Sequence, residues 1–138
     1  MPIAKACTLY SFTLPDRPGV LLALANRMRA ADITLLSLWA RSNEDQTSTM
    51  RCIPERDAQF RDFAKSAELQ PDEETVIHVS THEHGGDFIR VLETVATLNA
   101  NIDAIEAITL ENKTGWVITT DKSHVDSLLA QINDATYN

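Results

Sequence analysis

Hydrophobic and polar positions alternate along residues 7–14, and β-favouring side chains fill this stretch. This period of two predicts a half-buried strand. From Val20 to Met28 the apolar residues recur instead at helical spacing, which predicts an amphipathic helix. The pattern then predicts two strands and a second helix, at residues 32–41, 46–53 and 55–67.

The same order of elements returns 67 residues further along the chain. Residues 74–86 align with residues 7–19, so that Gly86 falls under Gly19. A helix, a hairpin and a second helix are expected behind them, at residues 87–100, 101–120 and 122–133. Few residues are identical between the two halves of the sequence, but five elements that recur in the same order predict an internal repeat.

A strand-helix-strand unit that is repeated with an intervening hairpin is typical of the ferredoxin-like split arrangement. We therefore predict an α+β chain of two tandem βαββαβ modules, residues 1–70 and 71–138, each an antiparallel sheet with both helices on one face. Residues 67–70 can supply the fourth strand of the first module. The second module lacks a good fourth strand, so its sheet either has an open edge or borrows a strand from residues 2–6 or from a partner chain.

The turn between the first strand and the first helix, "PDRPG", contains one of only four glycines. Asp16 is a good helix N-cap, Pro18 suits a first helical turn, and Gly19 leaves the backbone bare, so the turn could serve helix initiation alone. Free N–H groups behind a glycine also form a site for a carboxylate or phosphate. The glycine patterns of Walker-type and dinucleotide-binding loops are absent, which favours a small carboxylate ligand.

The stretch "FTLPDRPGVLLALANRMRAADITLLSL" resembles the opening of an ACT domain, a small-molecule-binding regulatory module of amino-acid metabolism. The strand, the D-R-P-G-V-L loop, the helix and the Ala-Asp-Ile segment behind it carry the resemblance. The resemblance extends over nearly the whole chain as two modules. The chain is therefore similar to free-standing tandem proteins of this family, which have no catalytic domain. The resemblance implies an amino-acid ligand, bound at the interface between one module's strand-to-helix loop and the start of the second strand in a paired module.

This resemblance pairs the loop of one module with the Asp32 or Asn101 position of the other. Asp32 stands where the family usually has Asn, and as an acceptor it suits a ligand amino group rather than a carboxylate. The second loop lacks the family's proline. The expected ligand-binding residues are Asp16, Arg17, Pro18, Gly19, Val20, Leu21, Asp32, Ile33, Glu83, His84, Gly85, Gly86, Asn101 and Ile102.

The net charge of −8 at pH 7 is unevenly divided: residues 1–70 hold nine Lys/Arg and eight Asp/Glu, whereas residues 71–138 hold three and twelve. An acidic surface repels phosphate backbones, which argues against nucleic-acid binding. No stretch nears the ~20 apolar residues of a membrane span, and the first residues do not resemble a targeting segment. We therefore expect a soluble, cytoplasmic protein with no membrane partner.

Three histidines, His78, His82 and His84, crowd one predicted strand and its loop, and the last two could meet one metal ion. Two loop histidines with no nearby cysteine make only a partial site, so neither a metal nor another cofactor is expected. Cys7 and Cys52 lie on predicted strands and face opposite sides, which favours neither a disulfide nor a nucleophile.

The sequence thus favours a non-enzymatic, allosteric protein that binds an amino acid and passes its occupancy to an enzyme or regulator partner or to its own homodimer. Two alternatives stay open. One is a constitutive dimerisation module without a ligand, and the other is a small metal-dependent enzyme built on the histidine region.

Overall fold

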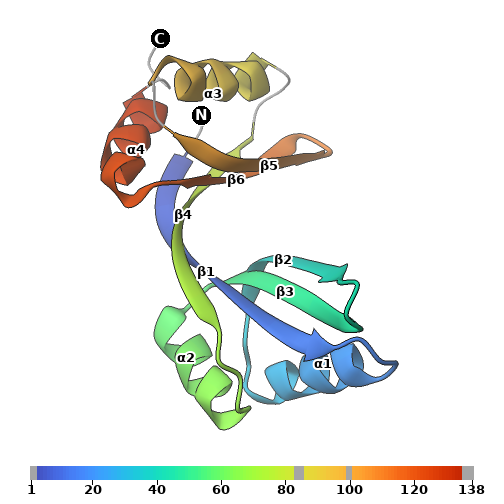
Figure 1. Cartoon of the computed structure of the whole chain (residues 1–138). Helices are drawn as coiled ribbons and strands as arrows, with labels where there is room; N and C mark the ends of the chain where they lie inside the picture. Colours follow the sequence, from blue (N-terminus) through green and yellow to red (C-terminus); the bar gives the residue numbers. More distant parts are fainter. Residues whose placement is uncertain (1–2, 83–85, 99–100, 135–138) are drawn as a thin grey trace. The chain divides into compact units, whose positions relative to one another are not determined.

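A computed structural model describes residues 3–82, 86–98 and 101–134 (Figure 1). The chain divides into two compact units. Thr8–Glu74 form the continuous unit, and Met1–Cys7 together with Thr75–Asn138 form the discontinuous unit. The N-terminal residues therefore go with the second half of the chain, whereas the predicted division is a single boundary between residues 70 and 71.

The continuous unit follows the order strand, helix, two strands, helix, strand. Its hydrogen-bonded strand order is β2-β3-β1-β4, and β3 pairs antiparallel with both β1 and β2. Tyr10 of β1 and Leu38 of β2 both lie opposite Cys52 of β3. The elements are β1 (Ile3–Pro15), α1 (Val20–Ala30), β2 (Leu35–Ser42), β3 (Thr47–Pro54), α2 (Asp57–Ser66) and the start of β4 (Asp72–Thr81).

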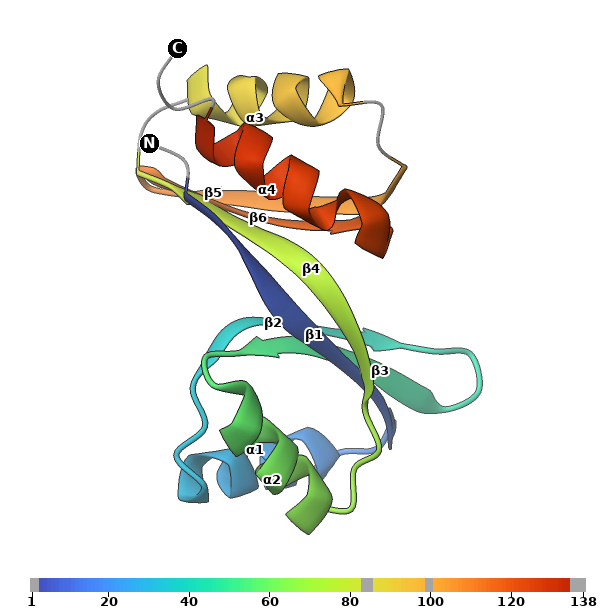
Figure 2. The same cartoon turned by 90° about the vertical axis from the view of Figure 1, so that its left-hand side faces the viewer.

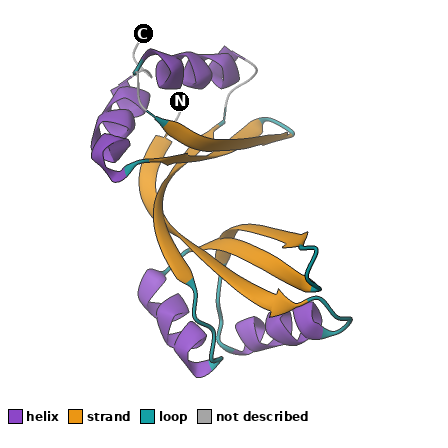
Figure 3. Ribbon diagram, in the orientation of Figure 1, coloured by secondary structure: helices purple, strands orange, loops and turns teal. Residues whose placement is uncertain are grey.

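Both helices of the continuous unit cover the same face of its strands, and the core lies between them (Figures 1 and 3). The apolar stripe of α1 buries Leu24 and Met28, and α2 buries Phe60 and Phe63. The ring of Tyr10 lies 4.6 Å from that of Phe60, centroid to centroid. The helical spacing of these residues in the sequence is therefore explained by burial against one sheet face.

The discontinuous unit repeats this order after β4 with α3 (Gly86–Thr97), β5 (Ile102–Leu110), β6 (Lys113–Thr120), a short 3-10 turn (Lys122–His124) and α4 (Val125–Asp134). Strand β6 pairs antiparallel with β4 and with β5. Helices α3 and α4 cover one face of these strands (Figure 2). Their buried side chains, such as Val91 and Leu128, pack on Ile77, Trp116 and Ile118.

The N-terminal segment completes the core of the discontinuous unit. Ala4 is 7% exposed and packs in the same cluster as Ile77 and Val79. In the hydrogen-bonded order β2-β3-β1-β4-β6-β5, strand β1 is the neighbour of β4. Residues 2–6 were one of two predicted sources of the missing strand, beside a partner chain, and Ile3–Cys7 belong to this unit as part of β1.

One strand prediction is wrong, that for residues 67–70. Glu68 has a φ of +60°, and the N–H of Leu69 donates to the carbonyl oxygen of Ala64 at 2.8 Å. These residues close α2 with a left-handed turn of the Schellman type, so the strand begins only at Asp72. The α+β class and the antiparallel pairing are confirmed, with four α-helices in the part of the chain that the structure describes.

Candidate functional site

The turn between β1 and α1 depends on the backbone of Gly19. This residue is the N-cap of α1, with a φ of +87°, a left-handed conformation that glycine adopts without the strain imposed by a Cβ atom. Its carbonyl oxygen accepts from the N–H of Ala23 at 2.9 Å. The predictions that Asp16 caps the helix and that Pro18 occupies its first turn are wrong, because the helix begins only at Val20.

The first turn of α1 presents unpaired N–H groups. The N–H of Val20 donates to the carbonyl oxygen of Arg17 at 3.3 Å. The N–H groups of Leu21 and Leu22 have no hydrogen-bond partner among the described residues. Such donors, at the positive end of a helix dipole, favour a bound anion.

A hollow of about 230 Å³, the polar hollow, lies between this loop and the β2–β3 hairpin. Its lining residues include Asp16, Arg17, Ser42 and Ser48, residue types with partners for both ends of a zwitterion. Arg41 lies opposite Thr49, so its side chain is on the other face of the sheet from Ala40 and Ser42. Its lining residues are Leu14, Pro15, Asp16, Arg17, Val20, Leu21, Ala40, Arg41, Ser42, Ser48 and Met50.

The pairing of β3 with β1 and with β2 places the β2–β3 hairpin beside the β1–α1 loop. Ser48 of β3 lies opposite both Leu14 of β1 and Ser42 of β2. The N–H of Asp16 donates to the carbonyl oxygen of Gln46 at 2.9 Å, which ties the loop to the hairpin turn. The hairpin residues Arg41, Ser42 and Ser48 are not among the predicted site residues, because no local motif marks them and only the register places them beside the loop.

A second hollow, of about 430 Å³, lies between the same loop and the hairpin turn, and Asp16, Arg17 and Asp45 are among its lining residues. Asp45 of that turn accepts from the backbone and the hydroxyl of Thr47. The hydrogen bond from the Thr47 hydroxyl is the main reason that the pKa of the Asp45 carboxyl lies below its usual value. This carboxylate makes the second hollow less suited to an anion than the polar hollow.

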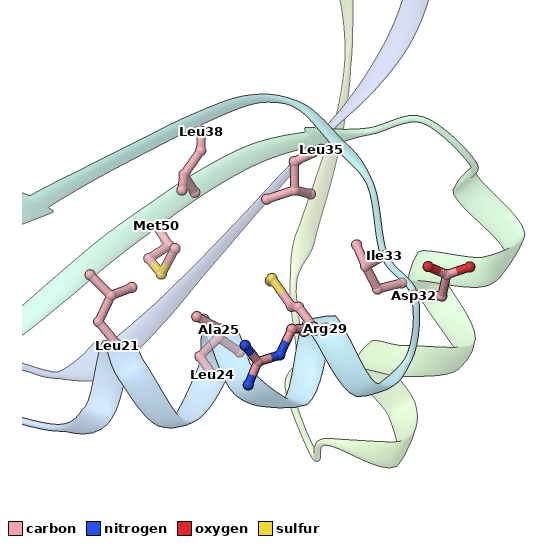
Figure 4. A pocket seen from close by; sticks show the side chains of 10 residues that line it. Leu21, Leu24, Ala25, Arg29, Asp32, Ile33, Leu35, Leu38 and Met50 are labelled. Atoms are coloured by element: carbon pink, nitrogen blue, oxygen red, sulfur yellow. The ribbon is translucent and has the colours of Figure 1, made fainter.

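The apolar hollow, of about 410 Å³, lies between α1 and β2 (Figure 4). It shares Leu21 and Met50 with the polar hollow, so the two adjoin. Leu21 and Leu38 are each about half exposed, at 53% and 50%. Its lining residues are Leu21, Leu24, Ala25, Met28, Arg29, Asp32, Ile33, Leu35, Leu38 and Met50.

Asp32 and Ile33 lie at the opposite end of α1 from the loop of their own unit, about 16 Å along the helix axis. Asp32 has a φ of +58°, and its N–H donates to the carbonyl oxygen of Arg29 at 3.0 Å. The N–H of Ile33 donates to the carbonyl oxygen of Met28 at 3.0 Å, which completes a Schellman motif. The residue type at position 32 therefore has a structural reason, since Asp tolerates the left-handed conformation better than most residues.

In the second half of the chain, Glu83, His84 and Gly85 lie outside the described residues. Gly86 is the first residue of α3. The carbonyl oxygen of Asn101 accepts from the hydroxyl of Thr120 at 2.8 Å, and Ile102 begins β5 against the core. No geometry of a second loop site can be built from these facts, and its residues stay predictions.

The described histidines and cysteines form no metal or nucleophile site. No group of three or more His, Cys, Asp or Glu side chains converges on a metal position in the described part of the chain. His78 is half-buried on β4, where burial and the nearby Lys5 lower its pKa. Cys52 is buried in the core, and burial raises the pKa of its thiol to about 12, so it stays protonated at neutral pH and is no nucleophile.

Among the described helices, none combines the length and the apolar character that a membrane crossing demands.

Several solved structures resemble the chain. A superposition on protein BT0572 from Bacteroides thetaiotaomicron has a TM-score of 0.79 at 16% identity and covers 96% of this chain and 90% of that one. The ligand-free regulatory subunit of aspartate kinase from Thermus thermophilus has a TM-score of 0.65 at 15% identity, with 97% and 95% covered. A structure of aspartokinase alpha and beta subunits has a TM-score of 0.60 at 19% identity, with 99% and 97% covered.

No family model matches the sequence, and no curated protein matches it significantly. At identities below 20% the structural likeness concerns the fold, and it supports an ACT-like α+β fold for this chain.

Proposed function

We propose that this chain is a non-catalytic regulatory protein that binds an amino acid at the polar hollow. One observation carries the proposal: the unpaired N–H groups of Leu21 and Leu22 start a helix that lines the same hollow as Arg17. Backbone donors and guanidinium groups are together the partners that a carboxylate prefers.

The charges of the polar hollow suit a zwitterion. The ligand carboxylate accepts hydrogen bonds from the first turn of α1 and from Arg17. The ligand ammonium group pairs with Asp16, which lines the same hollow, and with the hydroxyl groups of Ser42 and Ser48. An amino acid thus satisfies both signs of charge at once.

The regulatory part of the proposal draws support from fold likeness. One similar structure is the regulatory subunit of aspartate kinase from Thermus thermophilus, and another contains aspartokinase alpha and beta subunits. Binding that favours one conformation of the chain shifts its population, and a partner enzyme or regulator, or a second copy of the chain, reads that shift.

The tandem-module part of the proposal rests on the repeated element order in the two units. We propose a second, equivalent loop site in Glu83, His84, Gly85 and Gly86. The pairing of each loop with the Asp32–Ile33 or Asn101–Ile102 position of a paired module stays a prediction.

A second candidate function is constitutive dimerisation. Strands β2 and β5 are the two ends of the hydrogen-bonded strand order, so each has an edge without a strand partner in the described chain. Strand β5 exposes Ile108 at 61% and Leu110 at 66%. Unpaired edges with exposed apolar residues are typical of strand-to-strand association.

A thermal-shift panel of the twenty amino acids, followed by calorimetry on those that act, tests the proposed function. A ligand that binds only the folded chain raises the melting temperature, so we expect a rise with one or a few amino acids. The variant Arg17→Gln should weaken binding about tenfold or more, because charge-assisted hydrogen bonds are lost.

The matched control is Arg27→Gln, which removes the same charge from the last turn of α1, away from the polar hollow. It should leave the affinity unchanged. A flat panel contradicts the proposed function. If the chain is then a dimer by sedimentation, and Ile108→Glu makes it a monomer, the second candidate takes its place.

A further inference from the structure

The apolar hollow exposes large hydrophobic side chains directly beside the polar hollow. Leu21, at its junction with the polar hollow, is 53% exposed, and Leu38, on the facing strand, is 50% exposed. Figure 4 shows both side chains at the same end of the hollow as Met50. Apolar surface in this position stays in contact with water unless a ligand covers it.

We infer that the bound amino acid is a hydrophobic one, whose side chain enters the apolar hollow. This inference rests on the proposed function and names the ligand class for the same site. The carboxylate and ammonium groups lie in the polar hollow, and the side chain passes between Leu21 and Met50, the two residues that line both hollows.

The size and chemistry of the apolar hollow fit this role. Its volume of about 410 Å³ lies within the range of about 300–1,000 Å³ that is usual for small-molecule pockets. At the end nearest the polar hollow its walls are the hydrocarbon and thioether side chains of Leu21, Leu24, Leu38 and Met50. A polar ligand side chain there loses its hydrogen bonds to water and gains none, so serine, aspartate and lysine are disfavoured.

A reversed ligand, with its carboxylate at Arg29, is the competing orientation. The guanidinium group of Arg29 donates to Oδ1 of Asn26 at 3.1 Å, and Asp32 lies at the same end of the hollow. This is the C-terminal end of α1, where the helix dipole and the Asp32 carboxylate both repel an anion. The N-terminal orientation is therefore favoured.

Calorimetry on the full chain tests the inference with leucine, isoleucine, methionine and phenylalanine against alanine, serine, aspartate and lysine. The hydrophobic ligands should bind about tenfold tighter or more than alanine, since their side chains leave water for an apolar hollow. Leu38→Asn should remove about tenfold of leucine affinity and change alanine affinity by less than about twofold.

Leu36→Asn is the matched control, because Leu36 lies on the same strand at 40% exposure and does not line either hollow. It should leave both affinities unchanged. Leu21→Asn is the second variant if Leu38→Asn does not fold, and it should weaken leucine binding in the same way.

The outcomes separate the two proposals. Equal affinity for alanine and leucine, or a preference for a polar amino acid, overturns the inference and leaves the proposed function standing. A loss of leucine binding in Arg29→Gln, with binding by Arg17→Gln unaffected, overturns the orientation on which the inference depends. Binding of none of the eight amino acids overturns both.

Discussion

The side-chain amide group of Asn133 in α4 forms two hydrogen bonds with the backbone of Ala4. Its Oδ1 accepts from the N–H of Ala4 at 2.8 Å, and its Nδ2 donates to the carbonyl oxygen of Ala4 at 3.1 Å. The two residues lie 129 positions apart in the sequence. A single side chain thus replaces, for Ala4, the pair of hydrogen bonds that a neighbouring strand would supply.

Asn133→Ala should destabilise the discontinuous unit, because the N–H and C=O of Ala4 lose their partners in a part-buried position. We expect the free energy of unfolding to fall by about 1–3 kcal/mol. Urea unfolding followed by circular dichroism measures it. Gln131→Ala, an exposed change on the same helix, is the control and should cost less than about 0.5 kcal/mol. Equal effects of the two variants would contradict the role given to Asn133.

Glu68→Gly should stabilise the continuous unit. Glu68 has a φ of +60° in the turn that closes α2, a conformation in which glycine is free of the strain that a Cβ atom causes. We expect a gain of about 0.5–1 kcal/mol in the free energy of unfolding, seen as a higher melting temperature. Glu68→Ala keeps the Cβ atom and should bring no such gain. A glycine variant no more stable than the alanine variant would show that the turn is unstrained.

Two substitutions of Asp32 distinguish a structural role of this residue from a contact with the ligand. Asp32→Val places a β-branched residue at a φ of +58° and should cost about 1–2 kcal/mol of stability, whereas Asp32→Gly should cost nothing. Both variants remove the carboxylate. Because Asp32→Gly stays folded, calorimetry on this variant shows whether the Asp32 carboxylate contributes to ligand affinity. The ligand is the amino acid that acts in the thermal-shift panel. Equal stability of the two variants would argue against the left-handed turn.

The buried thiol of Cys52 should make the protein lose stability at high pH. Burial raises its pKa from 9.0 to about 12, so between these values the unfolded chain releases a proton that the folded chain keeps. The stabilising contribution is complete below pH 9 and is lost as the pH rises toward 12, at about 1.4 kcal/mol per pH unit.

Urea unfolding at several pH values from 8 to 11 measures this slope, with Cys52→Ala as the comparison. The variant should show a shallower decline that begins near pH 10, where Tyr10 starts to contribute because its own pKa is raised to about 12, mainly by burial. Parallel declines in both proteins would exclude Cys52 as the source.

The periodicity of the sequence was sufficient for the element order, because Leu24 and Met28, like Phe60 and Phe63, recur at the spacing of one buried helix face. Helix ends were less predictable. Asp16 and Pro18 look like a helix start, but the left-handed backbone of Gly19 sets the N-cap three residues after Asp16. No residue pattern in the sequence distinguishes a helix that is capped by Asp16 from one that is capped by Gly19.

The lining of the polar hollow was predictable only where it is local in sequence. Asp16, Arg17, Val20 and Leu21 belong to the loop and helix start that the sequence marks, whereas Ser42 and Ser48 line the hollow through the pairing of β1 with β3 and of β3 with β2. Register between strands depends on contacts distant in sequence, which a single sequence does not reveal. The apolar hollow was missed for the same reason, since its walls come from a helix and a strand edge.

The hydrogen bonds between Ala4 and Asn133 also have a consequence for folding during translation. Residues 3–7 leave the ribosome long before α4 but find these partners only when α4 has been made. The continuous unit, Thr8–Glu74, needs nothing beyond Glu74 for its own core and can fold while the rest of the chain is still being translated. Residues 3–7 must therefore wait through most of translation, and closing the discontinuous unit around so long an intervening chain is expected to be the slow, final step of folding.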